Sequence, residues 1–215
     1  MKYKIIDINS WSRKENYTWF TKHSPCKINI TSNIDITSLK AQIDENKLRF
    51  YPVLTYVVSS ILNKHDEFKT YLNKDDELVI YDNIHPRYPI FHKEDERISI
   101  LWSEHCDNFK EFYNNFTTDC ELYGEKRSMA AKGLYPKNIF DITSIPWVSF
   151  NSFDCASNIN NIFPPFVAFG KFFKQNKNIL LPLSISVHHA LCDGFHVGRF
   201  FEEVQSFVDE LNINI

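Results

Sequence analysis

The stretch that decides the fold runs from Ser184 to Gly198 and reads SISVHHALCDGFHVG. Residues of a buried strand lead into two histidines, and Asp193-Gly194 then turns the chain toward a helix. After Gly194 the apolar residues recur at intervals of three and four positions, at Val197, Phe200, Phe201, Val204, Phe207, Val208 and Leu211. We therefore expect the chain to end as a strand, a tight polar turn and an amphipathic helix.

Similar patterns extend over the rest of the chain. Alternating or β-branched segments predict strands at 3–8, 27–32, 78–82, 87–91, 97–102, 147–153, 166–173 and 179–188. Helical spacing predicts helices from Ser12 to about Lys22, from Asp35 or Thr37 to about Asn46, from Tyr51-Pro52 onward and from Asp107 onward. This mixture predicts an α/β protein in which an open sheet carries helices on one face.

Composition excludes several classes of function. The 215 residues hold 24 Lys and Arg against 27 Asp and Glu, so the formal charge is -3 and the basic stripe of a nucleic-acid binder is missing. With only 5 glycines the chain contains neither GxGxxG nor GxxxxGK[ST]. No repeat or Pro/Gly/Ser-rich linker divides it, so we expect one domain over residues 1–215.

The cysteines and the apolar stretches predict a cytoplasmic protein. The 5 cysteines are scattered and form no CxxC motif, a pattern typical of reduced thiols. The first ten residues lack the apolar core of a signal peptide. The longest uncharged apolar stretch, Ile179 to Val187, is far shorter than the roughly 20 residues of a membrane helix. We expect a soluble protein that binds neither membrane nor nucleic acid.

Taken by themselves, the two histidines allow three interpretations. Histidine is the side chain best suited to take a proton near neutral pH, so one of them is a candidate general base. An isolated pair at a strand end is more often merely partly buried and hydrogen-bonded. His189, Asp193 and His196 also have the spacing of metal ligands, but no second cluster of ligand residues completes a site, and we expect no metal.

Longer motifs decide between these interpretations. HHALCDG, at 188–194, resembles the HHxxxDG signature of CoA-dependent acyltransferases, and HHALCDGFHVGRF resembles the signature of the chloramphenicol acetyltransferase family. Further blocks that match this family, in its order, are SWSRKE at 10–15, FYP at 50–52, ELVIYD at 77–82 and IPWVSFNSF at 145–153. Condensation domains and plant acyltransferases share HHxxxDG but are about twice as long, so the short, trimeric bacterial enzymes fit better.

The resemblance implies a fold and an activity. The fold is a two-layer α+β sandwich, with a mixed, largely antiparallel sheet and helices on one face. The activity is acetylation of the primary hydroxyl of chloramphenicol, with acetyl-CoA as co-substrate and no permanently bound cofactor. The family forms homotrimers in which the catalytic histidine faces an acceptor pocket built largely by the neighbouring chain.

The resemblance also assigns roles to four residues of the catalytic machinery. His189 is the general base, so that the acceptor hydroxyl attacks the thioester directly. Ser152 donates a hydrogen bond to the oxyanion of the tetrahedral intermediate. Asp193 and Arg13 form a structural pair that holds the histidine loop. Because no acyl-enzyme forms, Cys192 is interpreted as a packed thiol rather than a nucleophile.

The binding residues follow the same resemblance. The acceptor pocket is expected to be lined by Trp19, Phe20, Ser24, Cys26 and Ile28, and CoA to be bound by Arg49, Tyr51 and Lys171. Three positions depart from the family: Ile28 and Ala130 lie where aromatic residues are common, and Ala168 replaces a threonine. These departures leave open an acetyltransferase for another hydroxylated acceptor and a non-catalytic binding protein of the same fold. A third alternative is the catalytic domain of a dihydrolipoyl acyltransferase, which shares the fold and the histidine motif.

Overall fold

Two β-sheets form the framework of the chain in the computed structural model, which describes residues 2–155 and 163–213. The larger sheet has the order β2-β10-β8-β7-β5-β6, with β9 beside β10. Its strands are β2 (Lys27–Asp35), β5 (His85–His92), β6 (Arg97–Trp102), β7 (Ile139–Ile145), β8 (Phe166–Gly170), β9 (Phe173–Gln175) and β10 (Asn178–His188). The smaller sheet has the order β1-β4-β3, from β1 (Tyr3–Ile5), β3 (Thr70–Leu72) and β4 (Leu78–Tyr81).

The larger sheet is mixed and mostly antiparallel, as predicted. Only β7 pairs in parallel, with β5 on one side and β8 on the other, among the strand pairs of the described residues. β10 is the longest strand, and most of it is buried because its central residues are covered on both faces. Its register against β2 runs from Leu180 opposite Asp35 to His188 opposite Lys27. This long pairing carries the two histidines to one end of the sheet.

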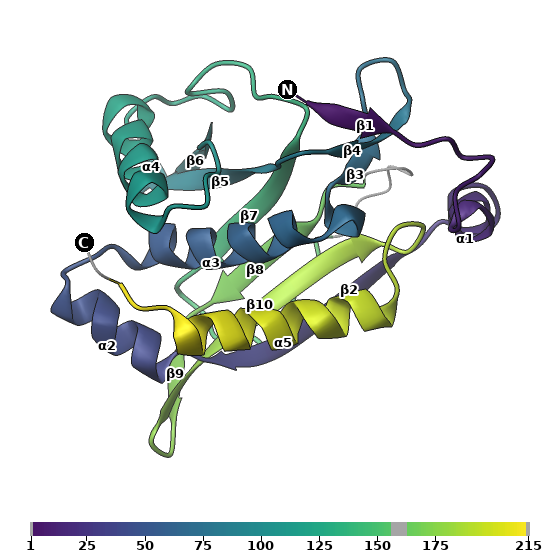
Figure 1. The fold of residues 1–215 in the computed structure, drawn as a ribbon. Helices are drawn as coiled ribbons and strands as arrows, with labels where there is room; N and C mark the ends of the chain where they lie inside the picture. The colour runs from purple at the N-terminus through teal and green to yellow at the C-terminus, as the bar shows by residue number, and fades with distance from the viewer. Residues whose placement is uncertain (1, 156–162, 214–215) are drawn as a thin grey trace.

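Helices cover one face of the larger sheet (Figure 1). They are α2 (Thr37–Glu45), α3 (Phe50–Lys64), α4 (Phe109–Tyr123) and α5 (Gly194–Glu210). The spacing of three and four in α5 has its reason here, because Val197, Phe200, Val204 and Val208 face the core and are buried. Complete burial of each such side chain contributes about 1.5–3 kcal/mol to folding. The two-layer arrangement is therefore confirmed.

Two short helical segments lie outside this layer. Near the N-terminus α1 (Lys14–Thr18) continues into the π-helical turn η1 (Trp19–His23). The 3₁₀ turn η2 (Asp66–Phe68) follows α3. The helix predicted over 12–22 thus corresponds to α1 and η1 together.

The strand predicted at 147–153 is wrong. The strand of this region is β7, which ends at Ile145, and residues 147–153 form a turn and an irregular segment. Pro146 has no N–H to donate to a sheet ladder, so the strand stops before it. Trp147 and Val148, whose apolar character produced the prediction, are exposed. The segment predicted as one strand over 166–173 is divided into β8 and β9.

Within residues 2–155 and 163–213, no helix combines the length and the apolar character that crossing a membrane requires.

Candidate functional site

The candidate site is built on the turn between β10 and α5, residues 189–193. The pairing of β10 with β2 continues past His188, because the His189 N–H donates to the Cys26 carbonyl at 3.0 Å. Behind it, the backbone N–H groups of Leu191 and Cys192 donate to the His188 carbonyl. The sheet edge and the turn therefore fix the backbone of His189, whose side chain remains 28% exposed.

The hydrogen-bond partners of His189 identify the basic nitrogen of its ring. Nδ1 lies 3.1 Å from the Cys192 carbonyl oxygen and 3.4 Å from Oδ1 of Asp193. Both are acceptors, so Nδ1 carries the hydrogen and Nε2 is the unprotonated nitrogen of the neutral ring. Phe20 stacks on the imidazole with ring centroids 3.9 Å apart and an interplanar angle of 17°. Nε2 is thus available to take a proton.

Asp193 joins the turn to the N-terminal part of the chain. Its carboxylate accepts from Arg13 through both guanidinium nitrogens, Nη1 to Oδ2 at 2.7 Å and Nη2 to Oδ1 at 3.2 Å. The hydrogen bond from Arg13 holds the pKa of Asp193 below its usual value, so the carboxylate is ionised at neutral pH. The Asp193 N–H also donates to Nδ1 of His196 at 2.9 Å. The structure thus places in contact the two residues that the resemblance pairs.

The other two reactive side chains of the motif are buried. His188 is 3% exposed, accepts at Nδ1 from the Ala190 N–H at 3.1 Å, and has its pKa lowered to about 4 by burial. Cys192 is 2% exposed, and burial raises the pKa of its thiol. That thiol donates to the Glu67 carbonyl at 3.8 Å. A protonated, enclosed thiol is a poor nucleophile, which agrees with its interpretation as packed.

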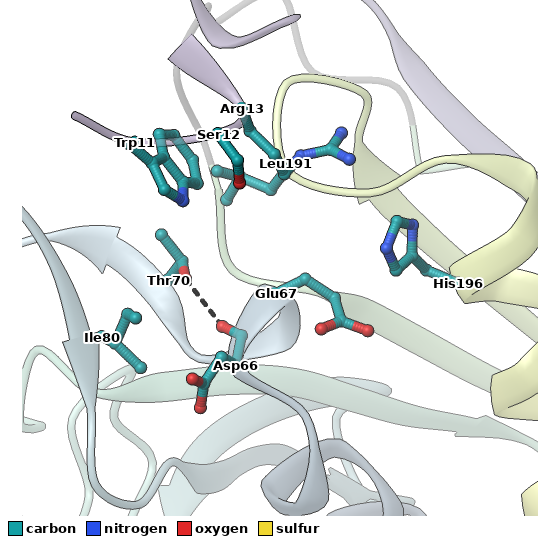
Figure 2. Close-up of a pocket in the computed structure, with 9 residues that line it drawn as sticks. All are labelled: Trp11, Ser12, Arg13, Asp66, Glu67, Thr70, Ile80, Leu191 and His196. Carbon is teal, nitrogen blue, oxygen red and sulfur yellow. Dashed lines mark hydrogen bonds between the residues drawn. The ribbon is translucent and has the colours of Figure 1, made fainter. Parts of the chain in front are cut away.

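A small cavity of about 190 Å³ lies beneath the turn (Figure 2). It is enclosed by the segment before α1, by η2 and by the start of α5. The residues that line it are Trp11, Ser12, Arg13, Asp66, Glu67, Thr70, Ile80, Leu191 and His196.

The residues expected in the acceptor pocket lie on η1 and at the start of β2. Phe20 contacts His189 directly. Cys26 is exposed, and its backbone carbonyl accepts from the His189 N–H. Ile28 pairs with Val187 in the sheet. Trp19 lies farther out, 56% exposed, with its ring against His23. Ser24 ends the η1 turn and is exposed.

A second, larger cavity of about 540 Å³ was not predicted from the sequence. Side chains from α3 and from β5 to β8 enclose it, so no local spacing pattern indicates it. Tyr51 lines this cavity, with its hydroxyl donating to the Ile142 carbonyl at 3.1 Å. The full lining is Phe50, Tyr51, Pro89, Ile90, Phe91, Ile98, Thr143, Ser144, Ile145, Pro146, Trp147 and Phe169.

Two exposed cations lie within two positions of residues that line this larger cavity. Arg49 immediately precedes α3, and Lys171 immediately follows β8. The two chain segments meet there, because the Phe50 ring lies 5.6 Å from the Phe172 ring and Tyr51 lies 5.4 Å from Phe169. The three residues expected to bind CoA are therefore brought to the same region.

Ser152 lies far from His189 within one chain. The Ser184 hydroxyl donates to the carbonyl of Phe153, and Asn29, opposite Ser186, donates to Asp154. The segment thus runs along β10 toward His189, with Ser152 on the far side. Ser184 and His189 are five positions apart, which corresponds to about 17 Å in a strand. No hydrogen bond between Ser152 and His189 forms in the described part of the chain.

Within the described ranges, no group of three or more His, Cys, Asp or Glu side chains is placed to hold a metal ion.

Comparisons with known proteins show relatives over nearly the whole chain. The family model described as chloramphenicol acetyltransferase matches residues 1–205. A chloramphenicol acetyltransferase from Escherichia coli is 42% identical over 209 residues, covering 97% of this chain and 94% of the relative.

Solved structures extend the comparison to the fold. A chloramphenicol acetyltransferase structure superimposes with a TM-score of 0.87 at 24% identity, covering 96% of this chain and all of that one. The cubic core of the pyruvate dehydrogenase multienzyme complex superimposes with a TM-score of 0.67 at 16% identity, covering 92% of this chain and 86% of that one. Both likenesses concern the fold alone.

Proposed function

This chain belongs to the chloramphenicol acetyltransferase family, and we propose on that basis that it inactivates chloramphenicol by transferring the acetyl group of acetyl-CoA to its primary hydroxyl. Within the structure, the observation that supports this proposal most directly is the hydrogen bonding of His189. With Nδ1 donating to the Cys192 carbonyl, Nε2 is left as a base on a partly exposed ring.

The reaction is direct attack without an acyl-enzyme. Nε2 of His189 takes the proton of the acceptor hydroxyl while its oxygen adds to the thioester carbonyl. The tetrahedral intermediate then collapses, the C–S bond breaks, and the CoA sulfur takes the proton from the imidazolium. The ionised Asp193, with Oδ1 3.4 Å from Nδ1, stabilises the imidazolium that forms between these steps.

The larger cavity and its flanking cations are the proposed CoA site. The apolar, aromatic lining suits the pantetheine arm, and Arg49 and Lys171 supply positive charge for the phosphates. Acetyl-CoA is a co-substrate here and leaves as CoA after each turnover.

The distance between the base and the larger cavity supports a site built from more than one copy of the chain. Phe169 of the larger cavity pairs with Leu183 of β10, six positions before His189, which corresponds to about 20 Å along a strand. This separation favours a site in which the base and the cavity belong to different chains. We propose a homotrimer in which His189 of each chain faces the cavity of a neighbour.

Three hydroxyl side chains are candidates for the oxyanion donor. Ser152 remains the proposal from the resemblance, while Thr143 and Ser144 line the larger cavity. Replacing each in turn, as Ser152→Ala, Thr143→Val and Ser144→Ala, separates them. Loss of one oxyanion donor lowers kcat by about 100- to 1000-fold. The variant with that loss identifies the donor.

Another hydroxylated acceptor is the second candidate function. Ala168 is fully buried between Thr143 and Ser184, and its methyl group offers no hydrogen bond there. Ile28 and Ala130 likewise lack the aromatic rings common in relatives.

A cytoplasmic location is also proposed, because the five cysteines are free thiols.

The deciding experiment measures release of CoA thiol from acetyl-CoA with chloramphenicol, for the wild type and His189→Ala. We expect rapid release by the wild type and a decrease of about 100- to 10,000-fold in the variant. Absence of release by a folded protein that binds CoA would redirect the search to other acceptors. Equal rates in both proteins would exclude His189 as the base, and CoA binding without turnover for any acceptor would favour a binding protein.

A further inference from the structure

A second ion pair holds the turn that carries His189. Arg199, six positions after Asp193 on α5, donates from Nη2 to Oε1 of Glu67 in η2. The side chains of Glu67 and Arg199 are 15% and 30% exposed, so both are largely shielded from solvent. This pair lies beyond the Arg13–Asp193 pair and joins α5 to a different part of the chain.

Glu67 contacts the turn region twice. Its backbone carbonyl accepts from the Cys192 thiol, and its carboxylate accepts from Arg199. Cys192 is also the residue whose own carbonyl lies 3.1 Å from Nδ1 of His189. Two hydrogen bonds therefore link Glu67 to the ring of His189, one from the Cys192 thiol to the Glu67 carbonyl and one from Nδ1 of His189 to the Cys192 carbonyl.

The η2 turn is a firm support for these contacts. Phe68 is fully buried, and its ring lies 6.1 Å from that of Phe200 on α5. The Thr70 hydroxyl donates to the Asp66 carbonyl at 2.6 Å, as Figure 2 shows. The position of η2 is thus set by core packing that does not involve the turn itself.

Apolar packing beneath the turn is incomplete. The cavity of about 190 Å³ separates Leu191 and His196 from Thr70 and Ile80, with Glu67 and Arg13 at its sides (Figure 2). Ala190, Leu191 and Cys192 pack into the core, and on the side of the cavity, where side chains do not fill the space, the polar contacts of Arg13 and Glu67 add to that packing.

We propose that Glu67 and Arg199 are positioning residues for the reaction, which hold the 189–193 turn and thereby the ring of His189. The inference rests on the proposed role of His189 as the base. Neither residue touches substrate. The Glu67 carboxylate holds α5 through Arg199, and this pair keeps η2, whose Glu67 backbone carbonyl accepts from the Cys192 thiol, in place beside the turn.

The test compares Glu67→Gln and Glu67→Ala with the wild type. A small displacement of a catalytic group lowers the chemical step strongly. We expect kcat to fall about tenfold or more in Glu67→Ala and less in Glu67→Gln, whose amide oxygen still accepts from Arg199, while KM for acetyl-CoA changes less than about twofold. The double exchange Glu67→Arg with Arg199→Glu is expected to recover part of the lost kcat.

A matched control is available on the same two segments. His65, just before η2, pairs with Glu203 of α5 through Nε2 at 2.8 Å, one helical turn beyond Arg199. Glu203→Gln removes the carboxylate from a hydrogen-bonded pair that joins the residue before η2 to α5, away from the turn. We expect its kcat to equal that of the wild type, even if its thermal stability falls as much as that of Glu67→Ala.

A second readout does not depend on the acceptor. The NMR signals of the His189 ring, identified by their absence in His189→Ala, are expected to shift and broaden in Glu67→Ala and to remain unchanged in Glu203→Gln. This comparison holds whether or not the wild type acetylates chloramphenicol, so failure of the proposed function is recognised separately. Unchanged His189 signals in Glu67→Ala, or equal kcat losses in Glu67→Ala and Glu203→Gln, would overturn the proposal.

Discussion

At the scale of single residues, His188 and His189 are neighbours in opposite surroundings. His188 is enclosed against Phe163 and accepts from the Ala190 N–H, whereas His189 keeps part of its ring exposed. Strand alternation explains the contrast, because successive side chains point to opposite faces. One histidine belongs to the core, and the other remains free for chemistry.

The buried histidine predicts a dependence of stability on pH. The folded pKa of His188, about 4, lies below the ordinary value near 6.5, so the unfolded chain binds the proton more readily. The free energy of unfolding is therefore expected to fall as the pH drops from about 6.5 to about 4, with His188 contributing on the order of 2 kcal/mol.

The comparison of wild type with His188→Asn isolates this contribution, because the Asn amide oxygen can still accept from the Ala190 N–H. Denaturant unfolding at several pH values gives the free energy of unfolding at each pH. We expect this free energy to change less with pH in the variant than in the wild type. His85 and His105, whose pKa values burial also lowers, contribute equally to both proteins. An identical pH dependence of the free energy of unfolding in the two proteins would contradict the contribution assigned to His188.

The Arg13–Asp193 pair predicts a loss that depends on geometry as well as charge. Asp193→Asn and Arg13→Val remove the ion pair, and both are expected to lower kcat by about tenfold or more because the turn loosens. Arg13→Lys keeps the charge but cannot donate through two parallel nitrogens, so its activity should be intermediate. Steady-state kinetics together with melting curves check this, and full activity in Asp193→Asn would exclude a positioning role.

At the scale of elements, one glycine controls how two segments meet. Gly170 ends β8 where the irregular segment after β7 crosses it. A Cβ atom there would lie 2.9 Å from Cε1 of Phe150 and 3.0 Å from the Val148 carbonyl oxygen. The neighbouring Lys171 N–H donates to that same carbonyl at 2.9 Å.

Gly170→Ala is therefore expected to displace the segment, to lower the free energy of unfolding by about 1–3 kcal/mol and to weaken CoA binding through Lys171. Calorimetric titration with CoA and denaturant unfolding measure the two effects. Gly198→Ala on α5 is the matched control, because nothing lies within 4 Å of its added methyl group. That variant should be as stable as the wild type or more stable by about 1 kcal/mol.

The same scale shows why sequence predicts some elements and not others. α5 was predicted because its apolar spacing is local and its buried face is regular. The sequence predicts the strand of this region at 147–153 instead of at β7, because Trp147 and Val148, beyond Pro146, are apolar although they are exposed. The larger cavity has no local signal at all, since its residues come from one helix and four strands. The contact of Arg13 with Asp193, across 180 positions, followed only from the family resemblance.

At the scale of the whole molecule, the separation of base and cavity predicts complementation between chains. His189→Ala lacks the base, and Ser144→Leu narrows the larger cavity. Each variant alone is expected to be nearly inactive. If the chain forms the proposed homotrimer, mixed trimers refolded from equal amounts of the two variants should recover about a quarter of wild-type activity, because one in four subunit boundaries joins an intact base to an intact cavity.

Thiol release before and after joint refolding measures this recovery, and gel filtration confirms that each variant alone forms the same oligomer. As a control, the two folded variants are mixed without refolding, which shows whether subunits exchange between intact oligomers. Absence of recovery, with mixed trimers present, would show that each chain completes its own site.

The stacking of Phe20 on His189 also limits how this protein can evolve. Phe20 belongs to the η1 turn that is proposed to contact the acceptor, and its ring covers one face of the imidazole of His189, the proposed base. A substitution there that suits a new antibiotic also changes the surroundings of the base. Selection for altered drug preference is therefore expected to favour changes at Trp19 or Ile28 before Phe20, because the Trp19 ring lies against His23 and Ile28 pairs with Val187, whereas Phe20 stacks on the His189 ring.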